Sequence, residues 1–257
     1  MTLSVLIVNW NTCELLRAGL LSLRRYPTAE PMEVWVLDNA SRDGSAAMVQ
    51  QEFPEVRLIA SERNLGYAAG NNLLMQKAQG EYLLLLNADT EVTEGALDTA
   101  VQFLREHPEA AALGAKLVHP DGRVQASVRG FPEPSAVMWE YLGLARLFPR
   151  SRRFGAYRMR WFTYDCVAEV DQPMGTFLML SRRAVEQVGL MDERFPIFFN
   201  EVDWCYRAKL GGWKIYFHPN VVIVHHGASL VAKVLPETLS PAAPVADIWA
   251  GPGKHYL

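Results

Sequence analysis

The sequence is poor in cysteine and has almost no excess of charge, and each shortage excludes a class of protein. Its three cysteines, Cys13, Cys166 and Cys205, lie far apart, and none belongs to a CxxC pair that would indicate a zinc or redox site. We expect them to be buried free thiols. The 25 basic and 28 acidic residues give a formal net charge of −3, so no global field favours nucleic acid as a partner. Any anion-binding site must therefore be local.

Long hydrophobic runs are absent as well. No apolar run approaches the roughly 20 residues that a membrane span needs. The first eight residues have neither the basic segment nor the cleavage site of a signal peptide. We therefore expect a cytoplasmic protein, for which contact with the inner face of a membrane is still an open alternative. With 257 residues, half of them hydrophobic, the chain can bury one large core.

The first ninety residues repeat one pattern, in which a short apolar run is followed by polar residues and then by a helix-like segment. The apolar runs cover residues 3–8, 32–37, 56–60 and 82–86. Strands that are hydrophobic on both faces are typical of parallel sheets covered by helices. The order βαβαβαβ predicts the opening of a doubly wound α/β sheet, which binds ligands at the carboxyl ends of its strands.

Local signals predict further helix and strand boundaries. Asn11, with Glu14 three residues later, is the pattern of a capping box at a helix start, and Gly80 is placed as the C-terminal cap of a helix over 67–78. Residues 119–123 read as a hairpin turn. Further on, we expect a strand at 175–181, a helix ending near Gly189, a helix from Glu201 to Gly211, and strands at 213–217 and 221–224.

Polar residues follow each of the four predicted strands, where ligands of such sheets bind. Asp89 comes after four leucines, so its carboxylate is expected at the sheet edge. Mg²⁺ or Mn²⁺ is often held by one or two carboxylates, with phosphate oxygens and water completing the shell. The alternative is that Asp89 only caps the next helix. The other candidates for binding a cofactor or substrate at this edge are Asn9, Asn11, Asp38, Asn39, Arg63, Asn64, Gly66 and Asn87.

Asp38, at the end of the second predicted strand, is a candidate for recognising a pyrimidine. Uracil and thymine expose an N3–H donor where cytosine has an acceptor, so a buried carboxylate would select uridine or thymidine nucleotides. The alternative interpretation is another helix-capping aspartate.

Four segments in this order carry a specific resemblance. They are Val-Asn-Trp-Asn at 8 to 11, Asp-Asn-Ala-Ser-Arg-Asp-Gly-Ser at 38 to 45, Asn-Leu-Gly-Tyr-Ala-Ala-Gly-Asn-Asn at 64 to 72 and Leu-Leu-Leu-Leu-Asn-Ala-Asp-Thr at 83 to 90. Together they resemble family 2 glycosyltransferases, most of all the bacterial rhamnosyltransferase-like branch, over roughly residues 2–227. The resemblance implies an inverting transfer, a metal at Asp89, contact between Asp38 and the base, and a nucleotide pocket lined by Asn9, Asn11 and Asn64.

The resemblance also implies a GT-A fold. Its central sheet is doubly wound and mainly parallel, with a smaller mixed sheet toward the C-terminus. We expect one catalytic domain over 1–227, in which 1–115 bind the nucleotide sugar and 116–227 bind the acceptor, followed by a tail over 228–257.

The catalytic base of similar enzymes lies in an acidic cluster that opens a helix after an aromatic run. Here Phe198-Phe199 is followed by Asn200-Glu201-Val202-Asp203, so an amide replaces the first acid of the usual cluster. An inverting displacement needs a carboxylate that takes the proton of the acceptor hydroxyl. Glu201 is the preferred base and Asp203 the alternative, although both also suit the start of a helix.

Two further features come from the second half of the chain. In similar enzymes a histidine after the last strand touches the metal or diphosphate, which points to His225 or His226. The region from about 130 to 170 interleaves arginines with aromatic residues, a pattern that suits an anionic lipid diphosphate, a membrane surface or a solvated loop.

The function expected from this resemblance is metal-dependent transfer of a sugar from dTDP-rhamnose or a UDP-sugar to a glycan or lipid-linked glycan. A sugar-phosphate nucleotidyltransferase is a second hypothesis, although Asn9-Trp10-Asn11 stands where such enzymes carry a glycine-rich basic loop. A catalytically weak binder of sugar nucleotides is a third, because Asn200 replaces an acid.

Overall fold

The computed structural model describes residues 1–195 and 198–227, so the tail expected over 228–257 lies outside the described residues. Residues Met1–His226 form one compact unit. Within the described ranges, no helix combines the length and the apolar character that crossing a bilayer requires.

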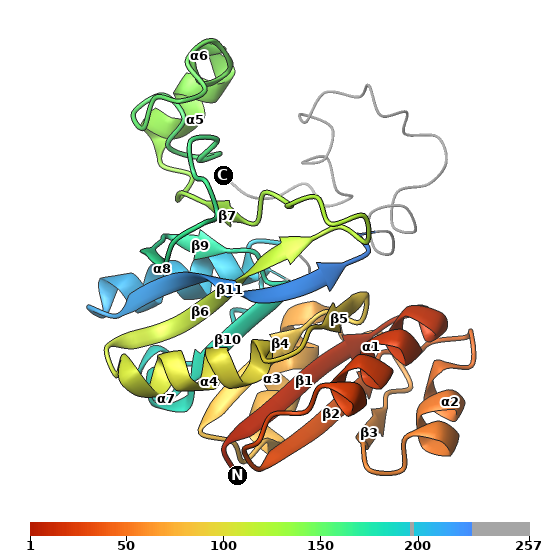
Figure 1. Ribbon diagram of the computed structural model, residues 1–257. Helices are drawn as coiled ribbons and strands as arrows, with labels where there is room; N and C mark the ends of the chain where they lie inside the picture. Colours follow the sequence, from red (N-terminus) through yellow and green to blue (C-terminus); the bar gives the residue numbers. More distant parts are fainter. Residues whose placement is uncertain (196–197, 228–257) are drawn as a thin grey trace. The chain divides into compact units, whose positions relative to one another are not determined.

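The four apolar runs near the N-terminus form strands, as their hydrophobicity predicts (Figure 1). Every residue of β4 is buried and nearly all of β1 is, as covering by helices on both faces requires. The elements of this part are β1 (Leu3–Asn9), α1 (Cys13–Arg25), β2 (Met32–Asp38), α2 (Ser45–Glu52), β3 (Arg57–Ala60), α3 (Tyr67–Lys77) and β4 (Tyr82–Leu86).

The second half of the chain has shorter and more varied elements. They are β5 (Thr90–Val92), α4 (Ala96–Glu106), β6 (Ala110–Val118), β7 (Val128–Arg129), α5 (Pro134–Tyr141), α6 (Leu144–Leu147), β8 (Ala168–Glu169), β9 (Gln172–Pro173), β10 (Phe177–Ser181), α7 (Arg182–Val188), α8 (Asn200–Leu210) and β11 (Lys214–His225). The two strands expected at 213–217 and 221–224 are one strand, β11, whose register against β6 shifts between His218 and Val222.

The larger sheet has the strand order β3-β2-β1-β4-β10-β6-β11-β5, with β8 also paired to β11. Strands β3, β2, β1 and β4 are parallel, and β10 runs antiparallel between β4 and β6. A separate sheet consists of the antiparallel pair β7–β9. This confirms the predicted α/β class. Because the chain passes from β3 to the far side of β1, strands β1 and β4 flank the point where the strand order reverses.

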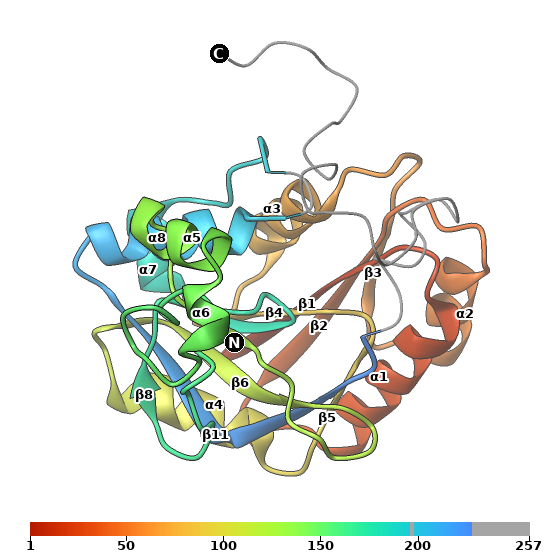
Figure 2. The same ribbon diagram turned by 90° about the horizontal axis from the view of Figure 1, so that it is seen from above.

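Helices cover both faces of the larger sheet, as Figures 1 and 2 show. On one face, side chains of α1, α2 and α4 pack in one hydrophobic cluster that includes Leu16, Met48 and Leu97. On the other, α3, α7 and α8 contribute to a second cluster that includes Leu74 and Trp204. Successive residues of β4 enter the two clusters alternately, which explains why no polar side chain interrupts this strand.

The start of α1 differs from the sequence prediction. Its N-cap is Thr12, which makes no capping hydrogen bond through its side chain, so the predicted capping box is wrong. Asn11 Oδ1 instead accepts a hydrogen bond from the Arg42 N–H at 2.8 Å. Glu14 pairs with Arg17 on the helix surface.

The end of α3 also differs. The helix ends at Lys77 with Ala78 as its cap, so Gly80 is not a helix cap. A Cβ atom on Gly80 would lie 2.6 Å from the backbone nitrogen of Ser4. Gly80 is therefore required by the close approach of this turn to β1.

Replacing Gly114 with alanine is expected to destabilise the fold strongly. A Cβ atom at Gly114 in β6 would lie 2.2 Å from the Cβ of Pro173 in β9. Overpacking of this kind costs about 1–3 kcal/mol or more, because one of the two strands must move. Thermal and urea unfolding midpoints measure the loss. Gly114→Ala should lower the unfolding midpoint less when Pro173 is replaced by glycine, because the clashing ring is then gone. An unchanged midpoint in the wild-type background would contradict the close approach.

Candidate active site

The ends of three parallel strands bring the two key aspartates to one edge of the sheet. In the pairing of β1 with β2, Asn9 lies opposite Asp38. On the other side, β4 runs parallel to β1 and ends at Leu86, and Asp89 follows within one short turn. Because the three strands point the same way, Asp38 and Asp89 lie at the same carboxyl edge, on either side of the end of β1.

Asp38 is buried, and both of its carboxylate oxygens accept hydrogen bonds from the protein. Asn9 Nδ2 donates to Oδ1 at 2.9 Å, and the Ser41 N–H donates to Oδ2 at 3.0 Å. The orientation of the Asn9 amide is set by its Oδ1, which accepts from the Thr12 hydroxyl at 2.6 Å. Since each carboxylate oxygen has further acceptor capacity, Asp38 can hold this loop and accept a hydrogen bond from a ligand at once.

The loops after β1 and β2 are locked to each other. The Asn11 N–H donates to Ser41 Oγ at 2.9 Å, and Asn11 Oδ1 accepts from Arg42. Asn11 and Ala40 have φ values of 53° and 63°, the left-handed region. For alanine this conformation costs about 1–2 kcal/mol, and such strain clusters at functional sites.

The loop after β3 is tied to the loop after β2 by side-chain amides. Asn39 Nδ2 donates to Asn64 Oδ1 at 2.7 Å, and Asn39 Oδ1 accepts from the Leu65 N–H at the same distance. The Gly66 N–H also donates to Asn64 Oδ1, at 2.8 Å, and Gly66 has a φ of 83°. The three residues therefore shape the rim of the site, with Arg63 exposed beside them.

The loop after β4 is held from two sides. The Asn87 N–H donates to the Thr176 carbonyl oxygen at 3.0 Å, which joins this loop to the start of β10. The Asp89 carbonyl oxygen accepts from the His226 N–H at 3.0 Å, which joins it to the end of β11. Asp89 itself is 6 % exposed, so its carboxylate has little access to bulk water.

A histidine faces Asp89 across this junction. His225 Nε2 lies 3.4 Å from Asp89 Oδ2, and both side chains are largely buried. Gln125 Nε2 donates to the His225 carbonyl oxygen at 2.7 Å, which turns Gln125 Oε1 toward His225 Nδ1, also at 2.7 Å. Because Oε1 only accepts, Nδ1 carries a proton and Nε2 is the nitrogen presented to Asp89. The second predicted histidine, His226, faces Glu91 Oε1 at 2.7 Å instead.

Glu201 lies in the first turn of α8, close to the backbone at Gly175. A Cβ atom on Gly175 would lie 3.5 Å from the Glu201 side chain, an ordinary van der Waals contact, so the two residues are direct neighbours. Burial raises the pKa of Glu201. A carboxylate with a raised pKa is suited to accept a proton near neutral pH.

Tyr67, at the start of α3, bonds to the backbone beside Glu201. Its hydroxyl donates to the Gly175 carbonyl oxygen at 3.0 Å. Burial raises the pKa of Tyr67, and the Glu201 and Asp89 carboxylates raise it further, so the phenol lies within electrostatic reach of both. Sequence reasoning missed Tyr67, Gln125 and Thr176. Tyr67 lay in the motif segment at 64 to 72 and Thr176 in the strand predicted at 175–181, whereas no sequence signal pointed to Gln125.

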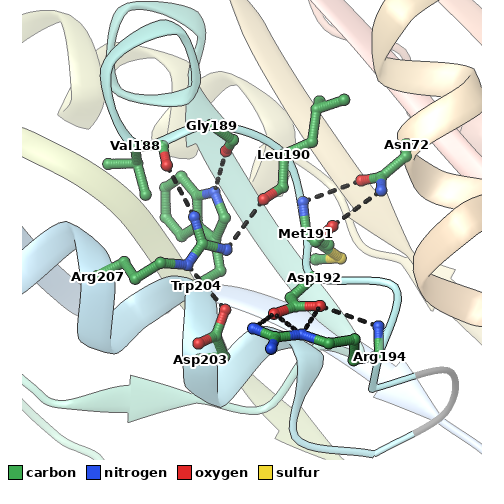
Figure 3. Close-up of polar contacts among 10 residues, drawn as sticks. All are labelled: Asn72, Val188, Gly189, Leu190, Met191, Asp192, Arg194, Asp203, Trp204 and Arg207. Carbon is green, nitrogen blue, oxygen red and sulfur yellow. Dashed lines mark hydrogen bonds and ion pairs between the residues drawn. The ribbon is translucent and has the colours of Figure 1, made fainter.

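Asp203, the alternative base, is engaged in anchoring α8 (Figure 3). Its Oδ2 accepts from Arg207 Nε at 2.8 Å. The same guanidinium donates to the carbonyl oxygens of Val188 at 2.7 Å and Leu190 at 2.9 Å, and Trp204 Nε1 donates to that of Gly189 at 2.9 Å. These contacts hold α8 against the loop that follows α7. Asp203 therefore belongs to the framework that positions the helix.

The chain matches a known protein family over most of its described length. Residues 4–188 match the family model described as Glycosyl transferase family 2. The chain belongs to this family. It is therefore a glycosyltransferase, as the four motif segments predicted.

Sequence relatives place it near the rhamnosyltransferases. It is 30% identical over 217 residues to the N-acetylglucosaminyl-diphospho-decaprenol L-rhamnosyltransferase of Mycobacterium tuberculosis, an alignment that covers 78% of this chain and 68% of the relative. The glycosyltransferase is also 24% identical over 211 residues to the low-salt glycan biosynthesis hexosyltransferase Agl10 of Haloferax volcanii, covering 80% of this chain and 61% of that relative.

Solved structures confirm the fold. The mannosyltransferase PcManGT from Pyrobaculum calidifontis, in complex with GDP-Man and Mn²⁺, superposes with a TM-score of 0.60 at 18% identity, covering 87% of this glycosyltransferase and 56% of that chain. GalNAc-T7 with UDP, GalNAc and Mn²⁺ superposes with a TM-score of 0.65 at 16% identity, covering 87% and 43%. The chain thus spans about half the length of these structures, and the likeness extends to the GT-A fold.

Proposed function

We propose that this glycosyltransferase moves a sugar, with inversion, from a pyrimidine nucleoside diphosphate sugar to a hydroxyl of a glycan or lipid-linked glycan, with Mg²⁺ or Mn²⁺ held at Asp89. The observation that carries the proposal is the largely buried pair of Asp89 and His225, at the sheet edge where Asp38 also lies. Glu201 and Asp89 are both close enough to raise the pKa of Tyr67. In this proposal residues 1–115 bind the nucleotide sugar and 116–227 the acceptor, within one catalytic domain.

The residues around Asp89 fit a divalent cation. Its carboxylate and His225 Nε2 face each other in a largely buried position, and Gln125 holds the imidazole in the orientation that such a ligand needs. Groups of three or more His, Cys, Asp or Glu side chains suited to a metal do not occur in residues 1–195 and 198–227. Two protein donors are what a site completed by diphosphate oxygens and water requires. A bound cation would supply positive charge to the departing diphosphate.

In the proposed reaction, Glu201 accepts the proton of the acceptor hydroxyl, and the oxygen of that hydroxyl attacks the anomeric carbon. The bond from that carbon to the diphosphate oxygen breaks, and the nucleoside diphosphate leaves from the opposite face. Burial has already raised the pKa of Glu201, which improves it as a base at neutral pH. Tyr67 keeps the backbone of Gly175 in place beside this carboxylate.

The direct test is the release of nucleoside diphosphate from UDP-sugars and dTDP-sugars in the presence of Mg²⁺ or Mn²⁺. We expect metal-dependent release of UDP or dTDP. Formation of pyrophosphate from a nucleoside triphosphate and a sugar phosphate would instead indicate a nucleotidyltransferase. Donor binding by calorimetry without transfer or hydrolysis, across many acceptors, would indicate a binding protein.

Asp38→Asn is expected to change the preference among pyrimidines. The wild-type carboxylate only accepts, which suits the N3–H of uracil or thymine, whereas an amide can also donate to the N3 of cytosine. The variant should bind UDP and dTDP about tenfold or more weakly and lose its discrimination against CDP. Calorimetric titration with the three nucleotides measures this. Loss of affinity for all three to the same degree would mean that Asp38 only supports the loop after β2.

The donor sugar and the acceptor are proposed from the relatives. The name of the mycobacterial relative points to rhamnose and to a lipid diphosphate acceptor, so dTDP-rhamnose is the first donor to test, before UDP-linked hexoses. Such an acceptor would place the enzyme at the inner face of a membrane. A thermal-shift screen over nucleotide sugars with Mn²⁺ is the simplest first step, because a ligand that binds the folded state raises the unfolding temperature.

A further inference from the structure

One segment carries a charge opposite to that of the rest of the chain. Between Pro134 and Tyr164 there are six arginines and one acidic residue, Glu140, a net charge of +5, while the remaining residues carry −8. All six of these arginines are exposed. They are Arg146, Arg150, Arg152, Arg153, Arg158 and Arg160. A local basic field therefore exists on a protein that is acidic elsewhere.

The same segment exposes large apolar side chains on a pair of short helices, which we term the α5–α6 hairpin (residues 134–148). On α5 the exposed Tyr141 lies three and four positions after the exposed Met138 and Val137, so it shares a face of the helix with each of them. Tyr141 is 90 % exposed, and Leu147, at the end of α6, is 69 % exposed. The full set of exposed apolar residues in the hairpin is Val137, Met138, Tyr141, Leu142, Leu147 and Phe148.

The hairpin is held in shape from within. Trp139 meets Phe154 edge to face at a centroid distance of 5.3 Å, and Phe154 lies 5.5 Å from the ring of Phe148. Glu140, the acidic residue of the segment, forms an ion pair with Arg158 at 2.9 Å. The exposed apolar face is therefore displayed on a preformed scaffold.

The hairpin begins beside the helix that carries Glu201. Phe131 and Pro134 line a pocket of about 350 Å³ together with Phe199, Val202 and Tyr206 of the α8 region. Figure 1 shows α5 and α6 beyond β7 and β9, apart from the larger sheet. A surface bound by the hairpin would therefore lie near the end of the enzyme where the acceptor is proposed to react.

We propose that the α5–α6 hairpin and the arginines that follow it bind the surface of an anionic lipid bilayer. Apolar and aromatic side chains enter the boundary between headgroups and acyl chains, while exposed arginines contact the anionic headgroups. The charge argues for this partner, since +5 on this segment complements an anionic surface and the negative remainder of the chain would be repelled from it. Membrane binding extends the proposed function, but it needs neither donor nor acceptor.

The experiment is flotation of the full chain with vesicles of phosphatidylcholine, alone or mixed with phosphatidylglycerol. We expect binding to the mixed vesicles, about tenfold or more weaker binding to phosphatidylcholine alone, and loss of binding as salt is raised. The double variant Leu142→Asp/Leu147→Asp should weaken binding to the mixed vesicles by at least about tenfold.

Leu210→Asp is the matched control, because Leu210 is 71 % exposed on α8 outside the hairpin and its substitution should leave vesicle binding unchanged. Release of nucleoside diphosphate without vesicles should be the same in the wild type and all variants. This assay tests the proposed function, and the flotation assay tests membrane binding independently of it. No binding of the wild type to mixed vesicles overturns the proposal. A smaller mass of the double variant in sedimentation, with vesicle binding unchanged, also overturns it, because the face would then join copies of the chain.

Discussion

Replacing Asp89 with alanine is expected to lower kcat/KM for metal-dependent transfer by about three orders of magnitude, which corresponds to ~4 kcal/mol of transition-state stabilisation. Asp89 is the largely buried carboxylate that faces His225 Nε2, and its loss leaves the imidazole as the remaining one of the two proposed ligands. Release of nucleoside diphosphate, followed over a titration of Mn²⁺, measures the effect. Asp89→Ala with full metal-dependent turnover would exclude the proposed site.

Two comparisons make this result specific. Asp121→Ala removes an exposed aspartate that pairs with Arg123 in the hairpin turn at 119–123, and it should leave the rate unchanged. His225→Ala should raise the Mn²⁺ concentration needed for half-maximal rate more than His226→Ala does, because His226 is directed toward Glu91. The reverse order would move the second ligand to His226.

Replacing Glu201 with glutamine is expected to lower kcat by about 10²- to 10⁴-fold, the usual contribution of a general base. The base must be ionised to accept a proton, and burial raises its pKa. The wild-type rate should therefore rise with pH through this raised pKa, and the rise should be absent in Glu201→Gln. Profiles of kcat/KM against pH for both proteins test the assignment.

Stability separates lost chemistry from lost folding in this variant. Because the folded-state pKa of Glu201 is raised, the carboxyl favours the folded state below its unfolded pKa, and this contribution is lost as pH rises through the folded pKa. Glutamine does not ionise, so Glu201→Gln should unfold at a higher temperature than the wild type at neutral pH. An inactive variant with a raised Tm would support a catalytic role.

Asp203→Asn is the matched comparison on the same helix. It weakens the contact with Arg207 that anchors α8, so we expect a lower Tm and a modest loss of rate. If Asp203→Asn lost more activity than Glu201→Gln, with its fold intact, the assignment of the base would be reversed.

The first half of the fold was predictable because its signals are local. β1 and β4 are runs of mostly apolar residues whose hydrophobicity on both faces already specifies a covered parallel strand, whereas β3, at the edge of the sheet, has no buried residue. The end of α3 was not predictable in this way. Gly80 occupies its position because of Ser4, which is far away in the sequence, and a pattern of neighbouring residues carries no information about such an approach.

The amino-acid sequence by itself determined the α/β class, the family, and the strand ends at which Asp38 and Asp89 lie, because chain-local hydrophobicity and motif spacing contain them. Only the tertiary structure selected His225 over His226 as the partner of Asp89 and brought Tyr67 to Gly175. The second contact joins positions 108 residues apart, and the bond from Gln125 that orients His225 spans 100. Contacts at such separations depend on how strands pair and helices pack, and these are properties of the folded chain as a whole.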